Sequence, residues 1–158
     1  MKRVVITGIG IVSPIGNNQK EVKQSLFFNS SGISFSKDYA DLGFRSHVHG
    51  DIDIDVNNFL DKKDLRFMGD GAAYTAIAMQ EAISDANLSD SLVSNSLTGL
   101  IAGAGGPSTL NLRVASDITR EKGPKRVGPF MVPKCMSSSI SACLSTMFKI
   151  KGLNYSIT

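Results

Sequence analysis

The sequence has little of the chemistry on which metal sites and disulfides depend, because its 158 residues include two cysteines and two histidines. Cys135 and Cys143 fall in one predicted helix, about 12 Å apart along its axis, which is too far for a disulfide. His47 and His49 lie far from both cysteines in the sequence, so a zinc site is not expected. We predict buried structural thiols and exposed loop histidines.

Long apolar runs and a strong charge imbalance are also missing. No run approaches the length of a membrane span. The short apolar run at residues 4–7 reaches glycine quickly and has no small-residue cleavage pattern, so it predicts a first strand and not a signal peptide, in a cytoplasmic protein. The net charge of +3 is too weak to indicate nucleic-acid binding. A content of 42% hydrophobic and 20% charged residues is typical of a globular domain.

The glycine motifs and serines do not match the common catalytic fingerprints. Gly8 and Gly10 follow a predicted strand, but Ser13 stands where a dinucleotide-binding loop has its third glycine, so a nucleotide-dependent oxidoreductase is only a minor hypothesis. Residues 103–106 (Gly-Ala-Gly-Gly) lack the Lys-Ser/Thr pair of an ATP-binding loop. Their small size instead predicts close approach of another chain segment or of a thin ligand such as an acyl chain. The serines at 137–139 have no nearby histidine, so no hydrolytic triad is expected.

The hydrophobic pattern predicts alternating strands and helices. The capping pair Asn18 and Glu21 opens a helix whose inner face carries Val22 and Leu26. The order of elements indicates an α/β layered fold with a largely buried sheet. The predicted strands are 4–7, 45–52, 98–103 and the segment from 155 onward; the predicted helices are 18–28, 62–68, 71–86, 109–120 and 134–148, with a basic, proline-containing loop at 122–133.

Positive charge gathers in two short segments. Lys62 and Arg66 are four positions apart on a predicted helix and so share one face, with Lys63 beside them. Lys125 and Arg126 form a second basic pair between two prolines. A solvated surface is the simpler interpretation, and an acidic partner that carries phosphate is the alternative.

Blocks of sequence spread over the whole chain carry a family resemblance: 1–13, 66–68, 99–103, 127–129, 141–144 and 149–157. Taken together they resemble the β-ketoacyl-[acyl-carrier-protein] synthases, the condensing enzymes of type II fatty acid synthesis, and among them the synthase I branch. The resemblance implies an α/β, thiolase-like layered fold, in which two related halves stack as αβαβα. Residues 1–158 would be the N-terminal half of that pseudo-duplicated domain and would end before the nucleophile.

The resemblance also implies an activity for the parent protein. It would be an acyltransferase that condenses acyl groups with malonyl-[acyl-carrier-protein], giving 3-oxoacyl-[acyl-carrier-protein] and CO2 without cofactor or metal. The chain ends within a predicted strand, and the family's nucleophilic cysteine would follow a few residues after Thr158. The family's two catalytic histidines and lysine would also lie outside the chain. We therefore expect no catalytic residue here and an inactive fragment; the alternative is a non-catalytic fragment that only binds carrier protein or a partner subunit.

Some residues of this chain match the family's binding positions. Gly106 and Pro107 match the lining of the acyl pocket, and Met136 matches the dimer interface beside the partner's pocket. Family members commonly have glycine where Pro107 stands, which bears on the preferred acyl length. The implied partners are acyl carrier protein, acyl and malonyl thioesters and a second copy of the full-length protein, with no nucleic acid and no membrane. The residues that match the carrier-protein docking site are Lys62, Lys63, Arg66, Lys125 and Arg126.

Overall fold

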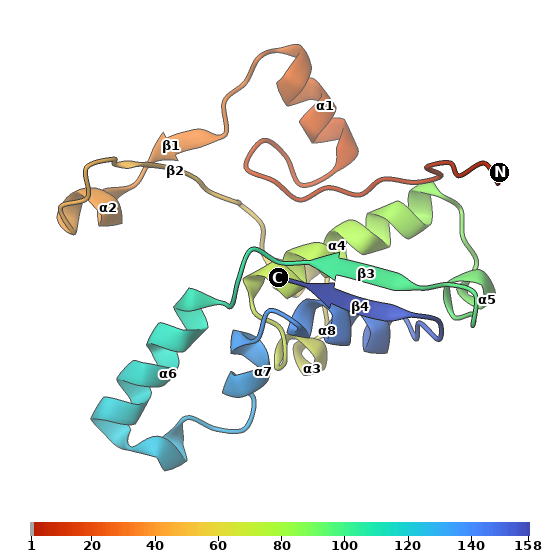
Figure 1. The fold of residues 1–158 in the computed structure, drawn as a ribbon. Helices are drawn as coiled ribbons and strands as arrows, with labels where there is room; N and C mark the ends of the chain where they lie inside the picture. Colours follow the sequence, from red (N-terminus) through yellow and green to blue (C-terminus); the bar gives the residue numbers. More distant parts are fainter. Residues whose placement is uncertain (1) are drawn as a thin grey trace. The chain divides into compact units, whose positions relative to one another are not determined.

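The computed structural model describes residues 2–158, and Figure 1 shows its ribbon. The chain divides into two compact units. The first contains the residues up to Asp55 together with Ile77–Ala86, and the second contains Val56–Ala76 and Asn87–Thr158. Helix α4 (Asp70–Asp85), predicted at 71–86, contributes residues to both units.

The first unit contains helical segments and a small hairpin. The strands of the hairpin are antiparallel, with Ile33 opposite Gly50 and Phe35 opposite Val48. The exposed strand predicted at 45–52 is therefore confirmed, while its partner strand was not predicted. The elements of this unit are α1 (Gln19–Phe27), β1 (Ile33–Phe35), α2 (Lys37–Asp41) and β2 (Val48–Gly50), with the last part of α4.

The predicted capping pair sets the start of α1. The side chain of Asn18 accepts a hydrogen bond from the Glu21 backbone N–H at 3.0 Å, and the Glu21 carboxylate accepts one from the Asn17 backbone N–H at 2.8 Å. Backbone donors that have no partner within the helix are thus satisfied. Val22 is buried, but Leu26 is 65% exposed, so only part of the predicted inner face is covered.

The strand predicted at residues 4–7 is wrong for this structure. These residues join no sheet, and Val4 and Ile6 are 91% and 83% exposed. A β-branched run forms a strand only where a neighbouring strand supplies hydrogen bonds, and none of the described residues does so here. Instead the following segment lies on α4, where a Cβ added to Gly10 would stand 1.7 Å from the Ala78 carbonyl oxygen.

The second unit is built around two parallel strands. Leu100 pairs with Asn154 and Gly103 with Ile157, and α8 contacts both strands (Figure 1). The predicted helix at 109–120 is confirmed as α6, and that at 62–68 as the shorter α3. The elements are η1 (Val56–Asn58), α3 (Lys62–Leu65), the first part of α4, α5 (Asp90–Val93), β3 (Leu100–Gly103), α6 (Thr109–Lys122), η2 (Pro124–Arg126), α7 (Met131–Cys135), α8 (Ser139–Met147) and β4 (Asn154–Ile157).

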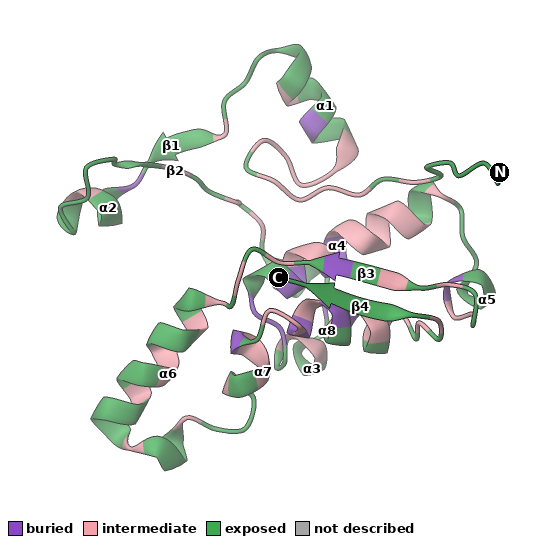
Figure 2. Ribbon diagram, in the orientation of Figure 1, coloured by how far each residue is buried: buried purple, intermediate pink, exposed green. Residues whose placement is uncertain are grey.

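The sheet of the second unit is less buried than predicted. Its core includes Leu144 of α8, which is 1% exposed, and Ala102 of β3. By contrast Ile101 is 71% exposed, and every residue of β4 is exposed, as the green strand in Figure 2 shows. Parallel strands become buried on both faces only when helices cover both sides of the sheet, so the prediction of a largely buried sheet is wrong for this structure.

The helix predicted at 134–148 is two helices. Pro133 lies within α7, where a short helix tolerates it because the first backbone N–H groups have no helical partner. The chain then leaves helical geometry at Met136 and resumes it in α8, and the Ser139 hydroxyl donates to the Pro133 carbonyl. Cys135 and Cys143 therefore lie on different helices, and both are free thiols. The predicted loop at 122–133 contains η2 and the start of α7.

Within the described residues, no helix is both long enough and apolar enough to cross a bilayer.

Candidate functional site

The first basic segment occupies α3 and the residue after it. Lys62 and Arg66 are exposed, and Arg66 keeps helical dihedrals (φ −58°, ψ −31°), so these two cations lie four positions apart on one helical side as predicted. Lys63 lies 3.5 Å from the Asp61 carboxylate, and both side chains are 74% exposed. Such an exposed pair contributes little to stability and does not bind Lys63 tightly.

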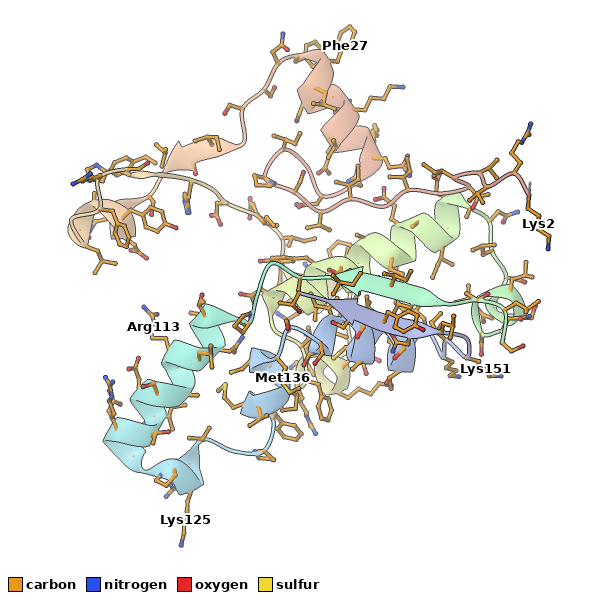
Figure 3. All side chains as sticks on the ribbon, viewed as in Figure 1. Lys2, Phe27, Arg113, Lys125, Met136 and Lys151 are labelled. Atoms are coloured by element: carbon orange, nitrogen blue, oxygen red, sulfur yellow. The ribbon has the colours of Figure 1, made fainter. Side chains whose placement is uncertain are left out.

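The second basic segment is the η2 turn. Gly123 precedes it with φ +83°, a backbone conformation that favours glycine. Lys125 and Arg126 are both exposed, and Lys125 extends away from the ribbon in Figure 3. Neither cation lies within 4 Å of a carboxylate belonging to the described residues. This segment can therefore offer its charge to a partner.

Two phenylalanines join the basic segments. The rings of Phe67, directly after Arg66, and Phe130, four positions after Arg126, lie 5.1 Å apart in an edge-to-face contact with an interplanar angle of 88°. This geometry is among those that aromatic rings prefer. Phe67 is 44% exposed and Phe130 is 37% exposed, so the pair remains open to solvent. The structure thus brings together two segments that the sequence keeps far apart.

A cavity of about 300 Å³ lies next to this pair, and we call it the α3–α8 cavity. Most of the side chains around it are apolar or carry polar atoms already bonded within the unit. Its lining residues are Asp64, Phe67, Met68, Pro133, Ser139, Ala142, Cys143, Thr146 and Met147.

Cys143 in this cavity is poorly suited to act as a nucleophile. Burial raises the pKa of its thiol above the ordinary value of 9.0, and the negative charge of Asp64 adds to the effect. The thiol donates a weak hydrogen bond to the Phe67 carbonyl oxygen at 3.8 Å. The reactive form of a cysteine is its thiolate, which a raised pKa disfavours. Among residues 2–158, no three His, Cys, Asp or Glu side chains cluster closely enough to hold a metal ion.

A second cavity, of about 260 Å³, lies at the end of β3, and we call it the glycine-loop cavity. It brings Met136 together with Gly106 and Pro107, which lie about 30 residues earlier in the sequence. A Cβ added to Gly105 or Gly106 would meet no described atom within 4 Å. The predicted close packing of another segment on residues 103–106 is therefore not found, and the glycines border open space. Met136 is 52% exposed.

Sequence reasoning did not single out three residues that these sites contain. Phe67 and Phe130 each lie close to basic residues in the sequence. This repeated pattern could have indicated that both phenylalanines belong to the basic surface. Lys134, the first residue of the predicted helix 134–148, lines the glycine-loop cavity, and no pattern in the sequence indicates this position.

The family described as "Beta-ketoacyl synthase, N-terminal domain" matches residues 1–158, the whole of this chain. The chain belongs to the β-ketoacyl synthase family. It is 50% identical over 160 residues to 3-oxoacyl-[acyl-carrier-protein] synthase 1 of Escherichia coli and 49% identical over 159 residues to that of Haemophilus influenzae. All of this chain is covered in both comparisons, and it spans 39% of the length of each relative.

Solved structures confirm the thiolase-like α/β fold. The ishigamide ketosynthase/chain length factor matches 99% of this chain and 40% of its own, with a TM-score of 0.87 and 20% identity. A type II PKS acyl-carrier protein in complex with its ketosynthase, bound to the hexaketide, matches all of this chain and 41% of its own, with a TM-score of 0.73 and 18% identity. The resemblance found in the sequence and the fold that it implied are both confirmed.

Proposed function

We propose that the whole protein to which this chain belongs is a 3-oxoacyl-[acyl-carrier-protein] synthase. The observation that carries the proposal is the identity of about one half, over every residue of this chain, to relatives named for that activity. An enzyme thiolate would attack the acyl thioester of the carrier protein. A thioester between enzyme and acyl group would form, and the carrier-protein thiolate would leave. Malonyl-carrier protein would lose CO2, and the resulting carbanion would attack that thioester, releasing the enzyme thiolate and 3-oxoacyl-carrier protein.

The basic segments are the proposed docking surface for acyl carrier protein. An acidic partner gains charge-assisted contacts from exposed cations, and such cations also increase its association rate. Support comes from the contact between Phe67 and Phe130, which holds the two segments together. One of the similar structures contains a ketosynthase in complex with an acyl-carrier protein. The docking residues are Lys62, Lys63, Arg66, Lys125 and Arg126.

The glycine-loop cavity is the proposed contribution of this chain to the acyl pocket. Gly106 leaves room beside the backbone for a thin acyl chain, and Pro107 stiffens the loop and fixes its φ. The proposal includes a homodimer in the cytoplasm, with Met136 at the interface. The exposed side chain of Met136 supports an interface at this position.

An elongation assay tests the proposed activity. The whole protein is incubated with acyl-carrier protein and malonyl-carrier protein, and the products are followed by mass spectrometry. We expect release of CO2 and an acyl chain two carbons longer as its 3-oxo form. The proposal fails if the folded protein produces neither, while an authentic synthase in the same mixture does.

A further inference from the structure

Helix α1 ends in two phenylalanines that are largely exposed. Phe27 is 80% exposed and Phe28 is 71% exposed, and their rings contact each other at 5.1 Å with an interplanar angle of 88°. We call this pair the α1 tip, and Figure 3 shows Phe27 at the end of the helix. Burial of such large apolar side chains in an apolar environment is favourable, so the tip is a candidate contact surface.

Backbone hydrogen bonds close the chain around the α1 tip. The Phe28 N–H donates to the Gln24 carbonyl oxygen at 2.9 Å. The Ser30 N–H donates to the Ser25 carbonyl oxygen at 2.8 Å. Asn29 between them has φ +53°, the left-handed conformation in which many helices end. These carbonyl groups at the end of α1 are therefore already satisfied, which lowers the cost of moving the tip out of water.

The outward side of α1 carries positive charge next to the tip. Lys20 and Lys23 precede Phe27 by seven and four positions, so the three side chains lie on one side of the helix. Both lysines are exposed, and neither lies within 4 Å of a carboxylate of the described residues. Glu21, the one carboxylate of α1, accepts a hydrogen bond from the Asn17 backbone N–H. This side of the helix thus combines free cations with aromatic surface.

The size of this surface favours a lipid membrane over a folded protein as its partner. A stable protein interface needs about 800 Å² on each partner. Two phenylalanine side chains supply about 300–500 Å² at most, and the chain continues into the polar residues 29–31 (Asn-Ser-Ser). A lipid surface sets no such minimum, because single aromatic rings enter the boundary between headgroups and acyl chains while lysines stay at anionic headgroups.

We propose that the α1 tip, together with Lys20 and Lys23, is a contact surface for membranes that contain anionic lipids. The two rings enter the boundary between headgroups and acyl chains, and the lysines attract the negative surface. Two rings and two charges give a reversible contact that depends on lipid composition. The family resemblance implies no membrane partner, so this inference departs from it, and it does not depend on the condensing activity.

Flotation of the whole protein with lipid vesicles tests the contact. We expect binding to vesicles of phosphatidylcholine and phosphatidylglycerol in equal amounts, and binding about 10-fold weaker to phosphatidylcholine alone. Phe27→Ser with Phe28→Ser should weaken binding to the mixed vesicles about 5- to 30-fold without changing its salt dependence. Lys20→Glu with Lys23→Glu should weaken it about 10-fold at low salt and remove most of the salt dependence.

Leu97→Ser in the second unit is the matched control. Leu97 is 94% exposed, and no lysine or arginine lies within seven positions of it in the sequence. This variant should bind the mixed vesicles like the parent protein. The proposal is overturned if the parent protein does not bind these vesicles, or if the control loses as much binding as the α1 variants.

A tryptophan in place of Phe27 shows directly whether the tip enters the lipid. Residues 1–158 contain no tryptophan, and the difference between the spectra of Phe27→Trp and the parent protein isolates the new side chain. We expect a blue shift and quenching by brominated lipids with the mixed vesicles. Without this shift in the folded variant, the membrane contact is wrong even if the protein floats. Weaker self-association of the serine variant, with no vesicle binding by the parent, would instead assign the tip to an interface between copies.

Discussion

Two aromatic pairs in this chain have the same geometry and very different surroundings. Phe27 and Phe28 are neighbours at the end of α1, and their rings are 5.1 Å apart at 88°, as are those of Phe67 and Phe130. The first pair follows from local chain geometry, and both rings are more than 70% exposed. The second joins remote segments, has basic flanks and adjoins a cavity. Ring geometry alone therefore does not indicate the role of an aromatic pair. The sequence separation of the two rings and the residues around them are informative.

The two units also use their charges differently. In the first, carboxylates satisfy backbone donors: Glu81 accepts from the N–H of Ile11 and of Gln19, and Asp85 accepts from the N–H of Ile9. These carboxylates are hydrogen-bonded within the unit and fix the backbone of residues 9–19. In the second unit, the cations of α3 and η2 are exposed and largely without partners among the described residues. Charges of the first kind stabilise a fold, and charges of the second kind are available for recognition.

The largest difference between the units should be in their response to loss of an apolar side chain. Leu144 is 1% exposed in the second unit, whereas Leu26 is 65% exposed in the first. We expect Leu144→Ala to cost about 2–5 kcal/mol of stability, through lost burial and a new cavity. Leu26→Ala should change stability by about 0.5 kcal/mol or less. Urea unfolding of the whole protein measures both, and equal effects would contradict the assignment of the core.

Charge reversal should have the next largest effect. Lys62→Glu with Arg66→Glu should raise the KM for carrier protein about 10- to 100-fold, chiefly through slower association. Lys20→Glu with Lys23→Glu makes the same change of charge on α1 in the other unit and is the matched control. Kinetics at low and high salt measure the effect, which should shrink as salt screens the charges. An equal effect of the control would mean that net charge, not this surface, governs binding.

Features that depend on neighbouring residues could be predicted from the sequence. Asn18 and Glu21 gave the start of α1 because a cap is formed within one turn, and the alanines of α4 indicated its close packing. The basic face of Lys62 and Arg66 followed from helical spacing. Each of these arguments needs only a few consecutive residues.

Features that depend on residues remote in the sequence could not be predicted in this way. The run at residues 4–7 has the composition of a strand, but a strand also needs a neighbour, which composition does not reveal. The break at Met136 depends on Pro133 and Ser139, whose hydrogen bond closes a turn between two helices. Likewise the meeting of Phe67 with Phe130, and of Pro107 with Met136, is a consequence of the fold. The family resemblance matched Pro107 to the acyl pocket and Met136 to the dimer interface beside the partner's pocket, and it did not predict that the two meet within one chain.

Cys143 offers a smaller test of the second unit. Its raised pKa means that less thiolate is present at pH 8 than in an unstructured thiol whose pKa has the ordinary value of 9.0. Iodoacetamide should therefore label Cys143 more slowly than the same cysteine in the urea-unfolded protein. Asp64→Asn should speed labelling only a few-fold, because burial is the larger cause of the shift. Peptide mass spectrometry reads this site individually, and labelling as fast in the folded as in the unfolded protein would disprove burial of the thiol.

The smallest effect should come from Glu21 in the first unit. Its pKa is lowered below 4.5, first by the hydrogen bond from the Asn17 backbone N–H and then by that from the Asn18 side chain. A lowered folded pKa means that the contribution to stability is complete above pH 4.5 and is lost as the pH falls through the folded value. The side chain is exposed, so solvent screens the effect and loosens only the start of α1. NMR titration of the Glu21 carboxyl and hydrogen exchange of the Asn17 amide should both show the same midpoint, at a pH below 4.5. Glu21→Gln should remove the pH dependence of that exchange, and a midpoint at or above 4.5 would mean that the cap does not hold the carboxylate.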